Sequence, residues 1–242
     1  MDTARIAALL EPFVEPALSS TQLAQISTYI DLLLRWNARI NLTAIRDPEE
    51  IVTRHFGESL FLASHLFPAG VARTLLSASA VSTEVSGSPL IAPLARSGES
   101  APGTPQVLDI GSGAGFPALP LKIWAPQIRL TLIESNHKKA AFLREAARAL
   151  TLTDINVIAD RAETLSARPD FPKADVVTLR AVERFEKILP QAVTFLAPHG
   201  SLALLIGEAQ LRYLTSMTAL KWQDPIRVPQ SLARVLSIGV RE

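Results

Sequence analysis

Three glycines directly after a buried apolar stretch are the residues of this chain best suited to hold a nucleoside. The stretch Val107–Ile110 reads as a buried strand, and Gly111, Gly113 and Gly115 follow it. Glycine lets the backbone turn tightly and approach a ligand that any Cβ would exclude. A dinucleotide fingerprint has the spacing G-x-G-x-x-G, whereas position 116 is Phe and the third glycine falls one residue early. The spacing therefore favours S-adenosylmethionine (SAM), which has no pyrophosphate, over NAD or FAD.

Further candidate ligands follow the later strands of the same sheet. Glu134 ends the second apolar stretch, and its carboxylate could accept hydrogen bonds from ribose hydroxyls. Ala162 and Glu163 follow the third stretch, and Arg180 ends the fourth. Glu134 and Glu163 could instead only begin the helices that follow, since acidic residues favour first turns. Because the carboxyl ends of the strands share one edge, the whole set together favours a binding cleft.

Two side chains of this set have open roles. Phe116 either fills the core at the mouth of the glycine turn or covers the apolar face of the cofactor. Arg180 either orients a carboxylate or a base at the catalytic edge, or forms a plain surface ion pair. No residue is assigned as catalytic beyond this orienting role for Arg180.

A second constellation, near the N-terminus, combines cations with an aromatic ring. Such a stretch can clamp phosphates and stack a base. It can equally be a solvated helix face with Trp36 in the core, an interpretation that the nearby Asp31, Asp47, Glu49 and Glu50 favour. His55 and His65 have no metal-like partners, so no metal site is expected. The candidate RNA-binding residues are Arg35, Trp36, Arg39, Asn41, Arg46, Arg54 and His55.

The elements that must position these residues alternate between strands and helices. Helical spacing covers Thr21–Arg39, a second pattern opens at Pro48 and runs through Leu62, and Asn136 can cap a helix over His137–Leu150. Strands that alternate with helices predict a mainly parallel sheet. The predicted parallel strands are Val107–Ile110, Ile128–Ile133, Ile155–Ala159, Ala174–Leu179 and Ser201–Ile206, and the predicted terminal antiparallel hairpin is Ile226–Val228 with Arg234–Ile238.

Composition predicts an ordinary globular protein of three segments. Residues 1–66 are expected to form a helical extension packed on the core, residues 67–105 an Ala/Ser/Pro/Gly-rich insertion or loop, and residues 106–242 the SAM-binding core. The net charge of +1 confines any polyanion-binding surface to a local patch. The chain has no cysteine, which excludes thiolate nucleophiles and disulfides. No membrane span is evident, so we expect a cytoplasmic monomer.

Five sequence blocks resemble one known family. In order along the chain they are W-N-x-x-x-N-L-T at 36–43, I-R-D-P at 45–48, R-H-x-x-x-S at 54–59, V-L-D-I-G-S-G-A-G-F-P at 107–117 and R-A-E at 161–163. This combination resembles the RsmG family, also called GidB, the bacterial 16S ribosomal RNA guanine-N7 methyltransferases. The resemblance spans almost the whole chain, whereas a generic SAM enzyme would match only the glycine block.

The resemblance implies a fold, a cofactor and a substrate. The fold would be α/β and Rossmann-like, with a mainly parallel seven-stranded sheet, helices on both faces and an N-terminal helical extension. Gly111, Phe116, Ala162, Glu163 and Arg180 fall on the SAM-contacting positions of the family, while Glu134 as a ribose partner rests on its position alone. The partner would be 16S ribosomal RNA or the small ribosomal subunit, and the helical extension over residues 1–66 would face the RNA.

The chain also departs from the family pattern, which keeps two alternatives open. Ile206 stands where the family carries a lysine, and Ala233-Arg234-Val235 replaces an E-R-H-like motif. The alternatives are a SAM-dependent methyltransferase that acts on another RNA or a small molecule, and a non-catalytic RNA-binding protein. Guanine N7 has a free lone pair, so its methylation needs positioning more than a general base.

Overall fold

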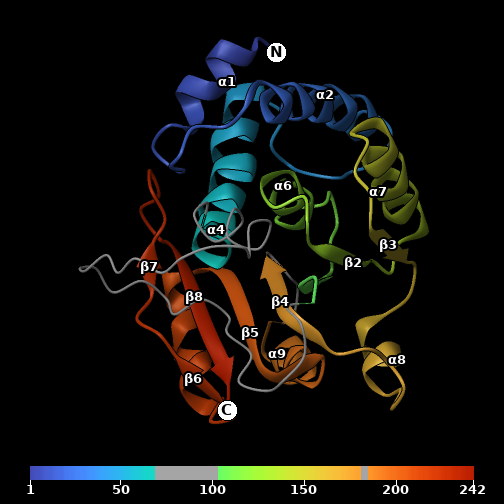
Figure 1. Cartoon of the computed structure of the whole chain (residues 1–242), viewed down its shortest axis with the longest axis vertical. Coiled ribbons are helices and arrows are strands. Elements are labelled where there is room, and N and C mark those ends of the chain that lie inside the picture. The colour runs from blue at the N-terminus through green and yellow to red at the C-terminus, as the bar shows by residue number, and fades with distance from the viewer. Residues whose placement is uncertain (69–102, 181–184) are drawn as a thin grey trace, which may run out of the picture.

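A twisted sheet with helices on both faces organises the molecule (Figure 1). The computed structural model describes residues 1–68, 103–180 and 185–242. Most of the predicted insertion, residues 69–102, lies outside the described residues. The strand order is β3-β2-β1-β4-β5-β8-β6, and β7 also pairs with β8. The predicted α/β fold with a mainly parallel sheet is confirmed.

Five parallel strands form the first part of the sheet, and the first four match the predicted bounds to within one residue, whereas the fifth begins five residues before the predicted Ser201. They are β1 (Gln106–Ile110), β2 (Arg129–Ile133), β3 (Ile155–Ile158), β4 (Ala174–Arg180) and β5 (Leu196–Gly207). The chain returns antiparallel to β5 as β8 (Arg234–Arg241). Because parallel strands begin and end at the same edges, the segments that follow β1 to β5 gather at one side of the molecule.

The sheet has eight strands rather than the seven expected, because its outermost position is divided. β6 (Leu220–Trp222) and β7 (Ile226–Arg227) pair antiparallel with successive stretches of β8. Pro225 lies between them and cannot donate a ladder hydrogen bond, so the edge strand is interrupted there. The predicted hairpin of β7 and β8 is present, whereas β6 was not predicted.

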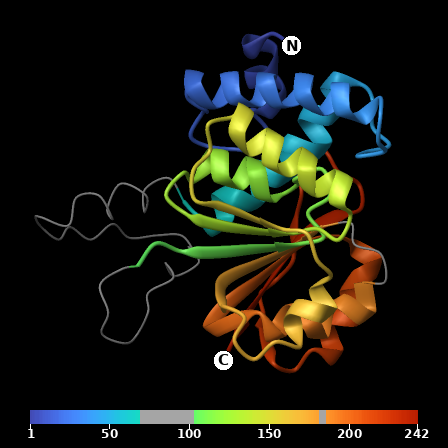
Figure 2. The same cartoon turned by 90° about the vertical axis from the view of Figure 1, so that its right-hand side faces the viewer.

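Alternate strand residues face two different hydrophobic cores. Figure 2 shows the helices that cover the two faces of the sheet. Val107 faces one core and Leu108 faces the other, as the two-residue period of a strand requires. The first core packs the N-terminal helices together with α6 (Ala118–Trp124) and α7 (His137–Ala149). The second packs α8 (Ala162–Ser166), α9 (Phe185–Thr194) and the 3-10 helix η2 (Glu208–Ser216). Asn136 caps α7 as predicted.

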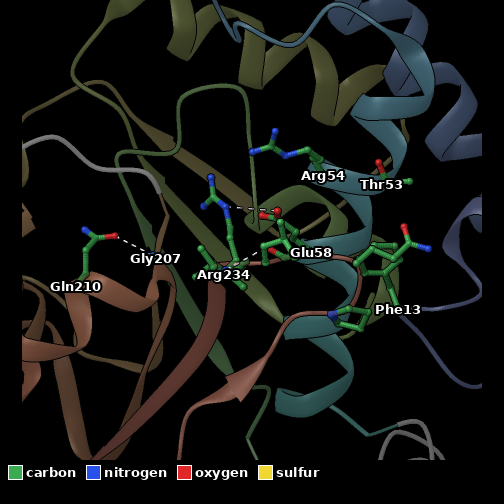
Figure 3. A pocket seen from close by; sticks show the side chains of 13 residues that line it. Phe13, Thr53, Arg54, Glu58, Gly207, Gln210 and Arg234 are labelled. Atoms are coloured by element: carbon green, nitrogen blue, oxygen red, sulfur yellow. Dashed lines mark hydrogen bonds and ion pairs between the residues drawn. The ribbon is translucent and has the colours of Figure 1, made fainter.

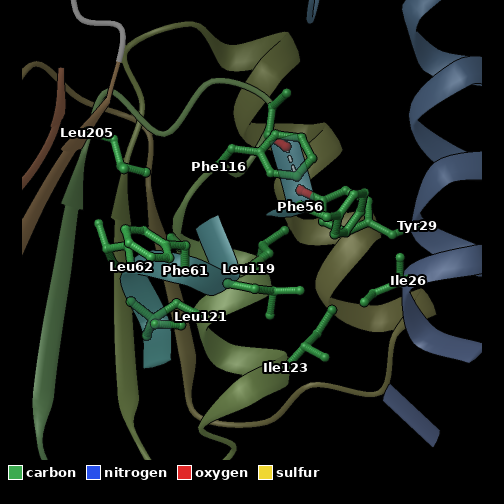
Figure 4. Close-up of a cluster of buried hydrophobic side chains, with 14 of the residues drawn as sticks. Ile26, Tyr29, Phe56, Phe61, Leu62, Phe116, Leu119, Leu121, Ile123 and Leu205 are labelled. Carbon is green, nitrogen blue, oxygen red and sulfur yellow. Dashed lines mark hydrogen bonds between the residues drawn. The ribbon is translucent and has the colours of Figure 1, made fainter. Parts of the chain in front are cut away.

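The N-terminal helices belong to the first core rather than to a separate unit. They are α1 (Thr3–Leu10), α2 (Ser20–Asn37), α3 (Pro48–Ile51), the π-helix η1 (Val52–Gly57) and α4 (Glu58–Leu66). A capping box of Ser19 and Gln22 starts α2, and Asp47 caps α3 with Pro48 in its first turn. Tyr29 of α2 and Phe56 of η1 meet Phe116 beside the glycine turn (Figure 4). The extension therefore reaches the predicted cofactor edge directly.

Candidate active site

The glycine turn after β1 has the backbone conformation that its sequence predicts. Gly111, Gly113 and Gly115 have φ angles of 70°, 54° and 84°, a region that residues with a Cβ rarely adopt. A Cβ at Gly115 would lie 2.3 Å from the hydroxyl of Tyr29. That hydroxyl donates a 2.5 Å hydrogen bond to the carbonyl of Ala114. Helix α2 therefore clamps the turn from the side opposite the cleft.

Glu134 holds this turn from the neighbouring strand. One carboxylate oxygen accepts 2.8 Å from the amide of Gly113, and the other accepts 2.8 Å from the amide of Asn136. The side chain does not cap α7, because Asn136 does so. Each carboxylate oxygen has a further lone pair, so Glu134 can still accept hydrogen bonds from a ligand. Its position supports the binding interpretation over the helix-start alternative.

Asp109, inside β1, is a buried carboxyl group that the sequence analysis did not single out. One oxygen accepts 2.6 Å from the hydroxyl of Thr178, while Oδ2 has no partner among the described residues. Burial raises the pKa of Asp109 to about 7, and the hydrogen bond from Thr178 opposes this rise only in part. The only sign of this residue in the sequence was a carboxyl group within the otherwise apolar stretch Val107–Ile110. The unpaired oxygen leaves a free acceptor beneath the glycine turn.

Phe116 is packed between two other rings. It stacks on Tyr29 at 5.3 Å between ring centroids and on His55 at 4.7 Å. Phe56 meets its edge at 5.1 Å. The core-filling interpretation therefore describes this ring, which also joins the glycine turn to the π-helix.

Arg180, at the end of β4, is the centre of a buried polar network rather than a surface residue. Its Nη2 donates to the carbonyl of Arg54 at 2.6 Å and lies 3.1 Å from Nδ1 of His55. The same nitrogen forms a 3.0 Å ion pair with Glu58. Burial lowers the pKa of Arg180 to about 10, which the nearby carboxylate of Glu58 partly offsets. The surface ion pair considered for Arg180 is thus replaced by a buried one.

The network fixes the protonation state of His55. Nδ1 of His55 lies 3.1 Å from Nη2 of Arg180, and Nε2 lies 2.7 Å from the hydroxyl of Thr43. Burial and the neighbouring cations Arg180, Arg54 and Arg234 lower the pKa of His55 to about 3. The imidazole is therefore neutral at physiological pH, and both of its nitrogens are engaged.

Glu58 connects this network to a cavity of about 670 Å³. While one carboxylate oxygen binds Arg180, the other lies 3.5 Å from Nε of Arg234 at the start of β8. Arg54 and Arg234 both line the cavity together with Glu58 (Figure 3). The sequence analysis missed Glu58, although it stands inside the R-H-x-x-x-S block.

The remaining predicted residues lie around this centre. Ala162 is buried at the start of α8, and Glu163 is exposed in the first turn of that helix, where an acidic residue is favourable in any case. Trp36 packs edge-on against Phe142 at 5.7 Å, so its ring belongs to the core. The exposed members of the predicted RNA-binding set are Arg35, Arg39, Asn41, Arg46 and Arg54.

The arrangement fits a nucleoside cofactor. The glycine turn has three positions without a Cβ, Glu134 offers free lone pairs, and buried Asp109 has one oxygen without a partner among the described residues. The amides of Gly111, Gly113 and Gly115 already donate within the chain. Among residues 1–68, 103–180 and 185–242, no group of three His, Asp or Glu side chains could hold a metal ion. In the same ranges no helix is both long and apolar enough to cross a membrane.

Solved structures give distant likenesses. Ribosomal protein L11 methylase from Lactobacillus delbrueckii subsp. bulgaricus gives a TM-score of 0.48 at 17% identity, over 58% of this chain and 72% of that one. A fibrillarin pre-rRNA processing protein from Methanococcus jannaschii gives 0.48 at 19% identity, over 57% and 67%.

Sequence relatives are far more similar. Proteins named ribosomal RNA small subunit methyltransferase G include one from Roseiflexus castenholzii (strain DSM 13941 / HLO8), 34% identical over 93% of this chain and 85% of that protein. Another, from Xanthomonas campestris pv. campestris (strain B100), is 33% identical over 92% and 88%. The relative from Chloroflexus aggregans (strain MD-66 / DSM 9485) is 38% identical over 76% of this chain, and the match spans 64% of that protein, just under two thirds. The profile of the GidB family, described as rRNA small subunit methyltransferase G, matches residues 22–74 and 85–224. By this match over most of its length, the chain belongs to the GidB family.

Proposed function

We propose that this protein transfers the methyl group of SAM to N7 of a guanine in 16S ribosomal RNA. The observation that carries the proposal is the glycine turn clamped by Glu134 at the carboxyl edge of the sheet, with the buried Arg180 network beside it. The names of the relatives supply the substrate, ribosomal RNA of the small subunit.

The cofactor residues are proposed from this geometry. SAM supplies an electrophilic methyl group on a sulfonium centre. Glu134 accepts hydrogen bonds from the ribose, and the turn formed by Gly111, Gly113 and Gly115, which has no Cβ at these positions, lets the backbone approach the ligand closely. Ala162 and Glu163, at the adjacent strand end, border the same pocket.

The chain contributes positioning rather than a general base. Guanine N7 keeps its lone pair at neutral pH, so no proton has to be removed before it attacks. His55, the imidazole nearest Arg180, has neither nitrogen free, because Nδ1 lies 3.1 Å from Arg180 and Nε2 lies 2.7 Å from the hydroxyl of Thr43. Arg180 itself is a positioning residue that holds η1 and α4 against the end of β4. The rate enhancement then comes from alignment of donor and acceptor.

The RNA surface is proposed to include the exposed polar residues of the helical extension. Arg35, Arg39, Asn41, Arg46 and Arg54 supply cations and one amide for phosphate contacts. Trp36 and His55 support this surface from within, since both are packed against other rings. We also propose that the protein acts as a monomer in the cytoplasm, where its ribosomal substrate is.

Methylation of small ribosomal subunits tests the proposal directly. Purified protein, labelled SAM and unmodified subunits should yield 7-methylguanosine in 16S RNA, located by modification mapping. A Gly111→Val control should abolish the label, because a branched side chain at a φ of 70° disrupts the turn. RNA that stays unlabelled, or label on another base position, would contradict the proposal.

A further inference from the structure

The cavity beside Glu58 lies next to the proposed methyl-transfer site but is built from different segments. Its walls come from the π-helix η1, the end of β5, the start of η2 and the turn between β7 and β8 (Figure 3). Its volume of about 670 Å³ falls within the roughly 300–1,000 Å³ of small-ligand sites. The cavity is therefore large enough for a nucleotide.

The charges that line the cavity favour an anion. Arg54 and Arg234 both border it, and the single acidic side chain among its lining residues, Glu58, is shared with buried Arg180. Arg54 also pairs with exposed Glu50 at 3.1 Å, an interaction that water weakens. Only Nε of the Arg234 side chain has a partner within the part of the chain described, so its two terminal nitrogens remain as donors. A guanidinium fork of this kind suits a phosphate.

A chain of contacts links this cavity to the residue that follows the glycine turn. Arg234 contacts Glu58, Glu58 contacts Arg180, and the Arg180 guanidinium lies 5.9 Å from the ring centroid of Phe116. Phe116 immediately follows Gly115 of the turn. A ligand in the cavity thus lies beside the edge where the cofactor is proposed to bind.

We propose that this cavity receives the target guanosine nucleotide of the RNA, with Arg234 bound to its phosphate. The inference rests on the proposed function and adds the site of the acceptor nucleotide to it. Arg54 supplies the second cation, and Glu58 is a positioning residue that aims Arg234 by holding its Nε. Enzymes that act on a base draw it out of its stack into such a pocket.

The same turn carries a side chain suited to replace the extracted base. Leu232 lines the mouth of the cavity, yet it is 95% exposed, the largest exposure of any big apolar residue among those described. Gln230, two residues earlier, has a φ of 57°, which gives the turn its sharp direction. Proteins that open base stacks use exposed apolar side chains as wedges. Leu232 fills the position of the wedge beside the proposed nucleotide site.

Kinetics with small ribosomal subunits test the assignment. Arg234→Ala should raise KM for subunits about tenfold or more, because one charge-assisted contact is lost, and should reduce the salt slope of kcat/KM by about one. SAM affinity by calorimetry should stay unchanged. Arg234→Lys should recover part of the loss, since the charge remains. The matched control is Arg129→Ala, an exposed arginine at the amino edge of the sheet, which should behave as wild type.

The outcomes separate this inference from the function on which it rests. If the wild-type protein is active and the Arg234→Ala variant has a normal KM and salt slope, the nucleotide site is overturned. The proposed function then still stands. Equal losses of SAM affinity and RNA affinity in Arg234→Ala would show a merely structural role and also overturn it. An inactive wild type would overturn the proposed function and the inference together.

Discussion

The cofactor side and the cavity side of the site consist of different chemical groups. On the cofactor side, a backbone amide of the glycine turn, that of Gly113, donates to the carboxylate of Glu134, which follows the next strand along the chain. On the cavity side, long charged side chains from η1, α4, β4 and β8 meet around Glu58. The first half is set by local conformation and the second by tertiary contacts, so the two should fail in different ways when mutated.

The largest effect is expected where the cavity side depends on a buried charge. Glu58→Gln removes the partner of Arg180 and should lower the free energy of unfolding by about 3–5 kcal/mol, because a buried guanidinium loses its counter-charge. Denaturant unfolding measures this loss. Glu50→Gln, which removes an exposed partner of Arg54, is the control and should cost less than about 1 kcal/mol.

Equal small losses in both variants would show that the network around Arg180 contributes no more than a surface pair. A double variant, Glu58→Leu with Arg180→Met, should regain part of the stability, since it removes both charges together. This result would also show that the network is retained for the site rather than for folding.

On the cofactor side, the backbone should be the sensitive element. Gly115→Ala combines a φ of 84° with a Cβ only 2.3 Å from the Tyr29 hydroxyl, so it should lower the free energy of unfolding by at least about 2 kcal/mol and weaken SAM binding. Gly113→Ala is the matched control, because its Cβ would meet nothing closer than 3.7 Å. Its cost should be limited to about 1–2 kcal/mol of backbone strain. A Gly113 variant as unstable as the Gly115 variant would refute the clamp by α2.

The carboxylate of the same half should act on affinity more than on stability. Glu134→Ala removes the proposed ribose acceptor and the hydrogen bond to Gly113, so SAM should bind roughly tenfold to a hundredfold more weakly. Glu145→Ala serves as the control, because its side chain is exposed on α7 and belongs to no proposed site. Calorimetry compares the two. If both variants bind SAM as tightly as wild type, Glu134 only supports the turn.

The same division explains what the sequence could predict. The glycine turn, Glu134, the strand pattern and the cap at Asn136 depend on neighbours in the chain, and the structure places them as expected. The partners of Arg180 come from residues more than 120 positions away, so no local pattern could identify Glu58 as its counter-ion. The π-helix over 52–57 likewise depends on packing, since the sequence shows only continuous helical spacing there. For Trp36 the sequence left two interpretations open, because a ring beside cations fits both a stacking platform and the core. Its contact with Phe142 places the ring in the core.

The smallest effect, and the finest test of the cavity side, concerns Leu232. Its side chain is 95% exposed, so Leu232→Ala should change the free energy of unfolding by less than about 0.5 kcal/mol and leave SAM affinity unaltered. If Leu232 fills the gap left by an extracted base, kcat/KM for small subunits should still fall a few-fold, equivalent to about 1 kcal/mol of lost stacking. Leu232→Met, which keeps a long apolar side chain, should retain most of the activity. A Leu232→Ala variant with wild-type kcat/KM would remove the wedge while leaving the phosphate contact of Arg234 intact, because the two side chains act on different parts of the nucleotide.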